Sequence, residues 1–480
     1  MKIIKNWADK NKMLYGTLLW SFIGFGYLLF IANWTFAIGL AGQGIVNGKA
    51  TPGFLSYFQV HNSASFELID KAANWAITFG RGIGSVVVAF LLVRFAHKRA
   101  TLIACTMTLF GIPALYMPGT NSGYILFLIF RTIMAIGGTM LTILFQPVAA
   151  NFFSKKSKSI YSQISIAFFP LGSIISIIPF VFVSDGGGIE ALRNSWRTVF
   201  LVISLLYLIP LLAVLVLGTD FDVKKDEEKV NGFKILKGYL KKKATYAWLL
   251  LFGGWLAIGV FPTSLSVVLF PWISGLDKET LGKQIRIWQV LFLCGGIIGP
   301  PIVGLWSRYN LKRRWFIGAV ISLAIIFFVL SIITYKYGLA PLYNKGSKSL
   351  NNGYKPILGL FYLLGILTGF CTWGIQSVIL YLPHEYKEAD PKTIGWMFSL
   401  IWGFGYMFFT LSLIIITAVP LIKGLNNTQI ATIQLSAVVF FTLLSLIGLL
   451  MLKEPRDDAK TFPFAKTKPE DQVAKRKVNL

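Results

Sequence analysis

The chain has 480 residues, of which 55% are hydrophobic and only 14% are charged, and its mean hydropathy is +0.66. Soluble domains carry about a quarter charged residues, so this composition excludes a soluble globular protein and indicates a bilayer around most of the chain. The net charge of +26 does not indicate nucleic acid, because the basic residues gather in short clusters beside apolar runs. Such clusters attract the headgroups of membrane lipids.

Twelve apolar runs are long enough to cross a bilayer, six in each half of the chain. This count predicts an all-α polytopic membrane protein with 12 transmembrane helices in two pseudo-symmetric six-helix bundles. The predicted spans are residues 14–41, 72–93, 100–117, 123–149, 160–184, 198–219, 245–272, 287–307, 315–335, 356–381, 393–420 and 430–452.

The distribution of basic residues predicts the orientation. With twelve spans both termini lie on one side, and that side would carry 32 of the 46 Lys and Arg residues, against 12 on the other side and 2 within spans. Because basic loops stay in the cytoplasm, we predict a multi-pass plasma-membrane protein, a monomer, with both termini cytoplasmic.

Four regions follow from this topology. We predict an N-terminal bundle over 1–219, a cytoplasmic linker over 220–244, a C-terminal bundle over 245–452 and a disordered cytoplasmic tail over 453–480. The tail has too little apolar content to fold alone. Two outer segments, 42–70 and 336–355, are longer than the topology requires, and such loops are either functional or mobile.

Two basic clusters indicate that the chain is duplicated. Residues 94–99 (RFAHKR) and 308–313 (RYNLKR) share the pattern Arg-aromatic-x-x-Lys-Arg, and Gly82 and Gly296 precede Arg94 and Arg308 by the same distance. Small residues allow helix backbones to approach closely, so helix packing is the favoured interpretation of these glycines.

The charges within the spans carry the strongest chemical signal. All twenty Asp and Glu residues lie outside the predicted spans, whereas Arg81 and Arg131 lie inside spans 2 and 4. Arginine stays protonated and offers a fork of donors to carboxylate or phosphate, so the two arginines favour an anionic substrate. Alternatively, they bond to backbone carbonyls or polar side chains and hold helices together. For Arg81 the two interpretations have equal weight, and for Arg131 a structural or gating role is preferred.

Asn33, Gln163 and Gln376 are further candidates for substrate binding, because a buried amide needs partners. The three histidines fall in loops, and the lack of a titratable side chain in the spans disfavours simple proton symport. No P-loop is present. We therefore predict no enzyme activity, no metal and no cofactor, and a small-molecule solute as the partner.

Over residues 10–452 the chain resembles the major facilitator superfamily. The family's loop signature, G-x-x-x-D-R-x-G-R-[RK], is matched by Arg94 and Lys98, while Ala89 and Ala96 stand where glycines are expected. Span 4, with Arg131 and two following glycines, is similar to the family's fourth helix. Val93 and Ser307 replace the signature Asp, so the resemblance does not extend to the gating ion pair that the family forms there. It nevertheless places Arg94 and Arg308 at the border of the cytoplasmic gate.

The resemblance implies a secondary transporter in which two halves rock about a central site. Anion carriers of the nitrate type use an arginine in span 2, although their matching arginine in span 8 is absent from residues 287–307. We predict a carrier of a small anionic metabolite such as an organophosphate. The alternatives are a carrier or exporter of a neutral or amphipathic solute and a membrane scaffold that transports nothing.

Overall fold

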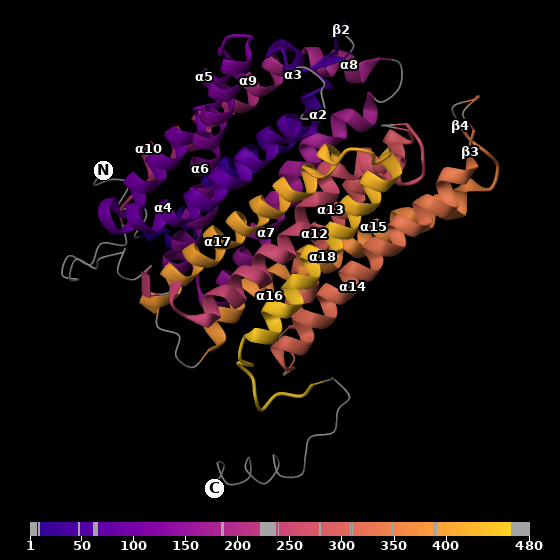
Figure 1. The fold of residues 1–480 in the computed structure, drawn as a ribbon. Helices are drawn as coiled ribbons and strands as arrows, with labels where there is room; N and C mark the ends of the chain where they lie inside the picture. The colour runs from indigo at the N-terminus through magenta and orange to yellow at the C-terminus, as the bar shows by residue number, and fades with distance from the viewer. Residues whose placement is uncertain are drawn as a thin grey trace.

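The computed structural model describes residues 7, 10–46, 49–60, 66–183, 187–220, 237–238, 240–277, 280–307, 309, 311–344, 346–347, 349–386 and 391–461. These residues form a bundle of long helices with two short β-hairpins, which confirms the predicted all-α membrane fold (Figure 1). The helices begin and end at local sequence signals. At the start of the last helix, for example, Asn426 and Gln429 form a capping box, which satisfies exposed backbone amides.

The first half of the bundle is built from nine helices and one hairpin among the described residues. They are α2 (Lys12–Leu40), β1 (Ile45–Val46), β2 (Lys49–Ala50), α3 (Phe54–Tyr57), α4 (Phe66–Thr108), α5 (Gly111–Ala114), α6 (Asn121–Phe152), α7 (Lys155–Phe182), α8 (Gly188–Asn194), α9 (Trp196–Leu206) and α10 (Leu208–Leu217).

The second half repeats this plan with different breaks. Its elements are α12 (Lys243–Ile273), α13 (Gly282–Trp306), α14 (Arg313–Ile333), the π-helix η1 (Thr334–Leu339), the 3-10 helix η2 (Ala340–Leu342), β3 (Tyr343–Asn344), β4 (Ser349–Leu350), α15 (Tyr354–Gly374), α16 (Gln376–Tyr381), the 3-10 helix η3 (Leu382–Glu385), α17 (Pro391–Thr417), the 3-10 helix η4 (Val419–Leu421) and α18 (Asn427–Met451).

Eleven helical segments within the described ranges are long and apolar enough to cross a membrane. The remaining predicted span, the third at residues 100–117, is divided into two helices. The second part of α4 ends at Thr108, and the short α5 follows after a turn. Pro113 explains the interruption, since proline lacks the N–H that continues a helix and its ring displaces the preceding carbonyl. The divided segment still crosses the bundle from the first basic cluster to Met117.

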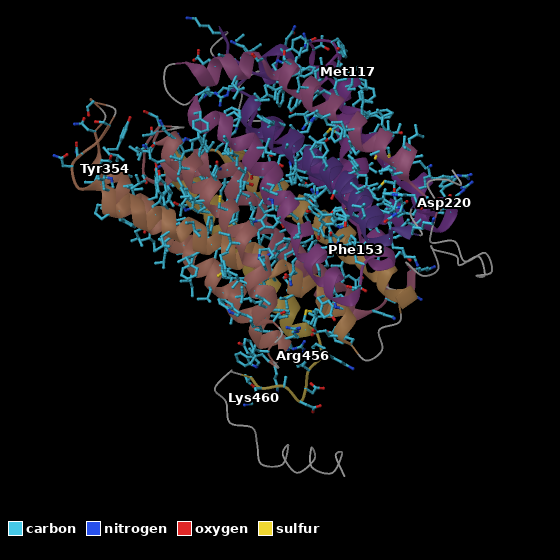
Figure 2. The ribbon with its side chains drawn as sticks, turned by 180° about the vertical axis from the view of Figure 1, so that it is seen from behind. Met117, Phe153, Asp220, Tyr354, Arg456 and Lys460 are labelled. Carbon is cyan, nitrogen blue, oxygen red and sulfur yellow. The ribbon has the colours of Figure 1, made fainter. Side chains whose placement is uncertain are left out.

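The ends of the bundle carry different residues. Figure 2 shows Met117 and Tyr354 toward one end and Phe153, Asp220 and Arg456 toward the other. We call the end with Phe153, Asp220 and Arg456 the basic end, because it carries residues 94–99, 309 and 311–314. The end with Met117 and Tyr354 is the opposite end. Segments that follow successive spans alternate between these ends, as the predicted threading requires.

Packing repeats in the two halves as the duplication predicts. A side chain at Gly84 would overlap the backbone of α6 at Ile136, and a side chain at Gly299 would overlap the backbone of α15 at Phe370. A side chain at Gly82 would meet the side chain of Met407 in α17, which belongs to the second half. The glycines before the basic clusters are thus sites of close helix packing.

Two seams join the halves. In one, α4 lies against α17, where the hydroxyl of Thr410 donates to that of Thr78 over 2.8 Å. In the other, α7 lies against α13, with Pro170 beside Gly296. In Figure 1 the orange α17 accordingly runs among the indigo and purple helices of the first half.

The two long loops differ in their packing. Residues 51–60 close over the opposite end of the first half, and Phe54, Leu55 and Phe58 there are fully buried. This part of the predicted 42–70 segment is therefore a packed cap. The 336–355 segment contains η1, η2 and the β3–β4 hairpin, which projects from the opposite end (Figure 1).

The predicted disordered tail begins with an ordered stretch. Beyond α18, residues 453–461 turn back along the basic end, and the backbone N–H of Lys312 donates to the carbonyl of Lys460 over 2.8 Å. The chain is therefore ordered beyond residue 453, where the disordered tail was predicted to begin. Residues 453–461 supply hydrogen-bonding groups to the second basic cluster. The rest of the predicted tail and most of the 220–244 linker lie outside the described residues.

Candidate functional site

Arg81 lies in the middle of the Ala72–Leu92 span of α4, fully buried, where α4 meets helices of both halves. Its Nη2 donates to the hydroxyl of Tyr27 in α2 over 3.1 Å. Five aromatic rings surround the guanidinium, with centroids 4.4 to 5.9 Å from its central carbon: Tyr27, Phe30, Trp34, Phe169 and Tyr406. We call this arrangement the Arg81 cage.

The cage compensates only part of the cost of burying the charge. A ring face within about 6 Å attracts a cation by roughly 0.5 to 2 kcal/mol, but a charged group taken out of water also needs hydrogen-bond partners. Nε and Nη1 of Arg81 have no hydrogen bond of regular geometry among the described residues, although the hydroxyl of Tyr406 also interacts with the guanidinium. Two donors of a permanent cation are therefore available to a bound molecule.

Arg131 is buried in a separate network inside the first half. Its Nη1 donates to Oδ1 of Asn33 over 2.9 Å and its Nη2 to the carbonyl of Asn33 over 3.2 Å. The amide of Asn33 in turn donates to Ser204 over 3.4 Å. These bonds tie α2, α6 and α9 together. Both Nη atoms of Arg131 are occupied, and Nε has no partner among the described residues.

Of the predicted polar residues, Gln376 lies near the cage and Gln163 does not. Gln376 starts α16 and is buried. Trp373, one turn earlier, stacks on the cage residue Phe169 at 4.5 Å between centroids. Gln163 is near the basic end of α7, where its amide packs against Gly304 of α13. The structure therefore separates the predicted substrate-binding residues into three places.

A third buried arginine was missed by sequence analysis. Arg286 lies within α13, which begins five residues before the predicted span 8, and is 6% exposed beside the ring of Phe180 in α7. The predicted boundary at residue 287 placed it in a loop. Arg286 is not the duplicated counterpart of Arg81. When the two basic clusters are aligned, Arg81 pairs with Gly295.

The basic end holds an ion-pair network that the sequence did not reveal. Arg313 forms a two-point ion pair with Glu385, donating through Nε over 2.6 Å and also through Nη2. Arg456, beyond α18, donates to the same carboxylate over 2.8 Å. Burial raises the pKa of the adjacent Tyr386 to about 12, so its hydroxyl stays protonated and donates to the carbonyl of Lys453.

Each basic cluster is also capped by an acid that follows the last helix of its half. Oδ1 of Asp220, after α10, accepts from the backbone N–H of Lys98 over 3.1 Å. The carboxylate of Glu454, after α18, accepts from the backbone N–H groups of Arg313 and Arg314, each over 2.9 Å. A carboxylate at a helix start satisfies amides that have no partner within the helix.

Of the two predicted gating residues, only Arg94 is described. Arg94 is exposed at the basic end, with its guanidinium carbon 5.3 Å from the ring centroid of Phe95. Arg308 lies outside the described residues. Across the described ranges, no group of three His, Cys, Asp or Glu residues is placed to hold a metal ion.

Comparisons with known proteins agree with this architecture. Residues 127–420 match the family model of Mycoplasma MFS transporters. The chain is 40% identical to an uncharacterized protein of Mesomycoplasma hyopneumoniae strain J, over 95% of this chain and 96% of that protein. It is 25% identical to a major facilitator superfamily transporter of Mycoplasma pneumoniae, over 89% and 91% of the two chains.

Solved structures share the fold at low identity. A crystal structure of a D-xylose-proton symporter superposes with a TM-score of 0.65 at 14% identity, over 92% of this chain and 99% of the symporter. A xylose transporter from E. coli in a partially occluded inward-open conformation gives a TM-score of 0.54 at 13% identity, over 93% and 100% of the two chains. At these identities the likeness concerns the fold.

Proposed function

The chain belongs to the Mycoplasma family of major facilitator superfamily transporters, and we propose that this secondary transporter moves a small anionic solute across the plasma membrane by alternating access. The observation that carries the proposal is the buried guanidinium of Arg81, with two donors unpartnered among the described residues. An anion there would supply both the charge and the acceptors that the protein does not provide.

The position of Arg81 suits alternating access. Its cage takes Tyr27, Phe30 and Trp34 from α2, Phe169 from α7 and Tyr406 from α17, so both halves contribute. A solute held between two rocking halves contacts both of them, and the seams α4–α17 and α7–α13 provide the surfaces that must slide or part. By the positive-inside rule, the basic end faces the cytoplasm.

The test begins with binding to the purified full-length protein in detergent. Carboxylates, phosphate esters and neutral sugars are screened by thermal shift, because a ligand of the folded state stabilises it. We expect stabilisation by anions. An anion that binds is then followed as flux into proteoliposomes, which separates a transporter of that solute from a scaffold.

Two substitutions locate the anion. Arg81→Lys keeps the charge but loses the fork, and Arg81→Gln loses the charge, so we expect affinity to fall by about tenfold and more than tenfold respectively. Lys423→Ala removes an exposed positive charge far from the cage and serves as the matched control. Stabilisation by neutral compounds only, or unchanged affinity in both Arg81 variants, would reject the anion proposal and favour a neutral solute.

A further inference from the structure

The second half contains a group of buried polar atoms that the fold leaves without partners among the described residues. They lie at the break between α15 and α16, where Gly374 packs against Gly299 and Val303 of α13 and the helix is interrupted at Ile375. The carbonyl of Thr372 accepts from Nε1 of Trp255 in α12 over 2.7 Å. This bond satisfies the backbone carbonyl of Thr372, and it is the side chains around the break that lack partners.

Three side-chain atoms at this break have no hydrogen-bond partner within the described ranges: Oγ1 of Thr372, Nε1 of Trp373 and Oε1 of Gln376. Their residues are only 0%, 2% and 7% exposed. Most buried polar atoms in proteins are hydrogen-bonded, and each unsatisfied one costs about 1 to 3 kcal/mol. Three within five residues indicate a place where a ligand supplies the missing bonds.

This group lies beside the Arg81 cage. The Trp373 indole stacks on Phe169 with centroids 4.5 Å apart and an interplanar angle of 29°. The ring of Phe169 also forms one wall of the cage, 5.9 Å from the guanidinium carbon. A single aromatic ring of α7 therefore connects the cation contributed by the first half with the polar atoms contributed by the second.

The chemistry of the group differs from that of the cage. Trp Nε1 only donates, Gln Oε1 only accepts and a threonine hydroxyl does both, and none of the three is charged. A carboxylate or phosphate would find at most two donors, an acceptor oxygen that repels it and no positive charge to balance it. An alcohol both donates and accepts, so one or two hydroxyl groups match the set.

We propose that Thr372, Trp373 and Gln376 form a hydroxyl-binding subsite, so that the solute is a polyhydroxylated anion such as a sugar acid or a sugar phosphate. This inference rests on the proposed binding of an anion at Arg81. The anionic group binds in the first half and the hydroxyl groups bind in the second, and one solute thereby contacts both halves.

The probes are chosen in pairs that carry the same anionic group with and without hydroxyl groups. Gluconate is compared with hexanoate, which has the same carbon number and carboxylate, and glucose 6-phosphate with hexyl phosphate. Sorbitol provides the hydroxyls without a charge. Dissociation constants come from thermal-shift titrations of the purified full-length protein. We expect the hydroxylated member of at least one pair to bind about tenfold more tightly, and the better pair distinguishes a carboxylate from a phosphate.

Near-isosteric variants test the three atoms. Thr372→Val, Trp373→Phe and Gln376→Met each remove the unpartnered atom and keep most of the side-chain volume. Each should reduce the affinity for the hydroxylated probe by about tenfold and leave the affinity for the non-hydroxylated probe unchanged. Thr372→Val and Gln376→Met, which keep the side-chain volume, should also slightly raise the melting temperature without ligand, because a buried unsatisfied group is lost.

Trp288→Phe is the matched control. The indole Nε1 of Trp288 is also buried and unpartnered among the described residues, but it lies elsewhere in α13, stacked between Phe292 and Phe361. This variant should keep full affinity for every probe.

The outcomes separate the two proposals. If anions bind but hydroxylation makes no difference, or if the three variants bind gluconate and glucose 6-phosphate as the wild type does, the subsite is rejected and the anion proposal stands. If sorbitol binds and no anion does, the anion proposal is rejected and with it the polyhydroxylated anion. If no probe binds, both are rejected.

Discussion

Tyr406 in α17 places its ring centroid 4.4 Å from the guanidinium carbon of Arg81 in α4. The two helices belong to different halves, and this ring is the nearest of the five in the cage. The contact therefore couples a buried charge to the α4–α17 seam. A movement that parts this seam removes one wall of the cage and exposes the cation to the solution on that side.

Replacing Tyr406 tests this coupling. Tyr406→Leu removes the ring, and we expect the free energy of unfolding to fall by about 1 to 2 kcal/mol. Tyr406→Phe keeps the ring and removes only the hydroxyl, which also interacts with Arg81, so it should lose less. Thermal or denaturant unfolding in detergent measures both, with Tyr116→Leu, at a 70% exposed site, as the control. Equal losses in the Leu and Phe variants would mean that the hydroxyl, not the ring, matters.

Ala96 predicts a stabilising substitution. α4 passes from span 2 to span 3 through Ala96, whose φ is 57° and ψ is 177°, a conformation that costs a residue with a Cβ about 1 to 3 kcal/mol. The signature of the family has glycine at this position. We expect Ala96→Gly to raise the free energy of unfolding by about 1 kcal/mol, as measured by unfolding in detergent.

Ala89 supplies the matched control for this prediction. It also stands where the signature has glycine, but it lies within the regular part of α4. Ala89→Gly should destabilise the protein by about 1 kcal/mol, because glycine is a poor helix former. If both variants shifted stability in the same direction, the backbone at Ala96 would not be strained.

The bilayer explains how much of the fold could be predicted from the sequence. Long apolar runs and the asymmetry of Lys and Arg depend on transfer from water to lipid, which each segment undergoes largely on its own. The six-plus-six plan, the duplication and the packing glycines before residues 94 and 308 followed from such local signals. Even the division of the third span has a visible cause in Pro113.

The candidate site depends on tertiary contacts, and these were less accessible. Arg81 was predicted to lie in a span, but its cage combines rings from α2, α7 and α17 that no sequence spacing relates. Arg286 was missed because the predicted start of span 8 came one residue after it. Glu385 was not recognised as a buried ion-pair residue, because its partners Arg313 and Arg456 lie in distant segments.

Glu385 should be important for stability. Its carboxylate serves Arg313 and Arg456 together and is 8% exposed. Removing one partner of a buried ion pair costs about 3 to 5 kcal/mol. We expect Glu385→Gln to lower the free energy of unfolding by an amount toward the lower end of this range, because Arg456 stays partly exposed, and Arg313→Met with Glu385→Met to recover part of the loss.

The double-mutant cycle decides whether the pair acts as a unit. If the losses of Arg313→Met and Glu385→Met simply add in the double variant, the two side chains do not stabilise the basic end through each other. Asp457→Asn controls for the loss of a negative charge, because it neutralises a nearby carboxylate that is not part of the Arg313–Glu385–Arg456 network.

Cysteine labelling tests the orientation of the basic end. In a variant without native cysteines, Lys423→Cys at the opposite end and Arg99→Cys at the basic end both place a thiol at an exposed position. A maleimide that does not cross membranes should label the Lys423→Cys protein in intact cells, and the Arg99→Cys protein only after lysis. The reverse pattern would place the basic end outside.

The partner of Arg131 leads to a prediction about energy coupling. Arg131 is held by the amide and carbonyl of Asn33, neither of which titrates, and no Asp or Glu lies in the eleven candidate spans of the described chain. Solute flux into proteoliposomes should therefore leave the pH of the lumen unchanged, as read by an enclosed pH-sensitive dye. Lumenal acidification that depends on solute and persists in an electrically shunted membrane would contradict this prediction.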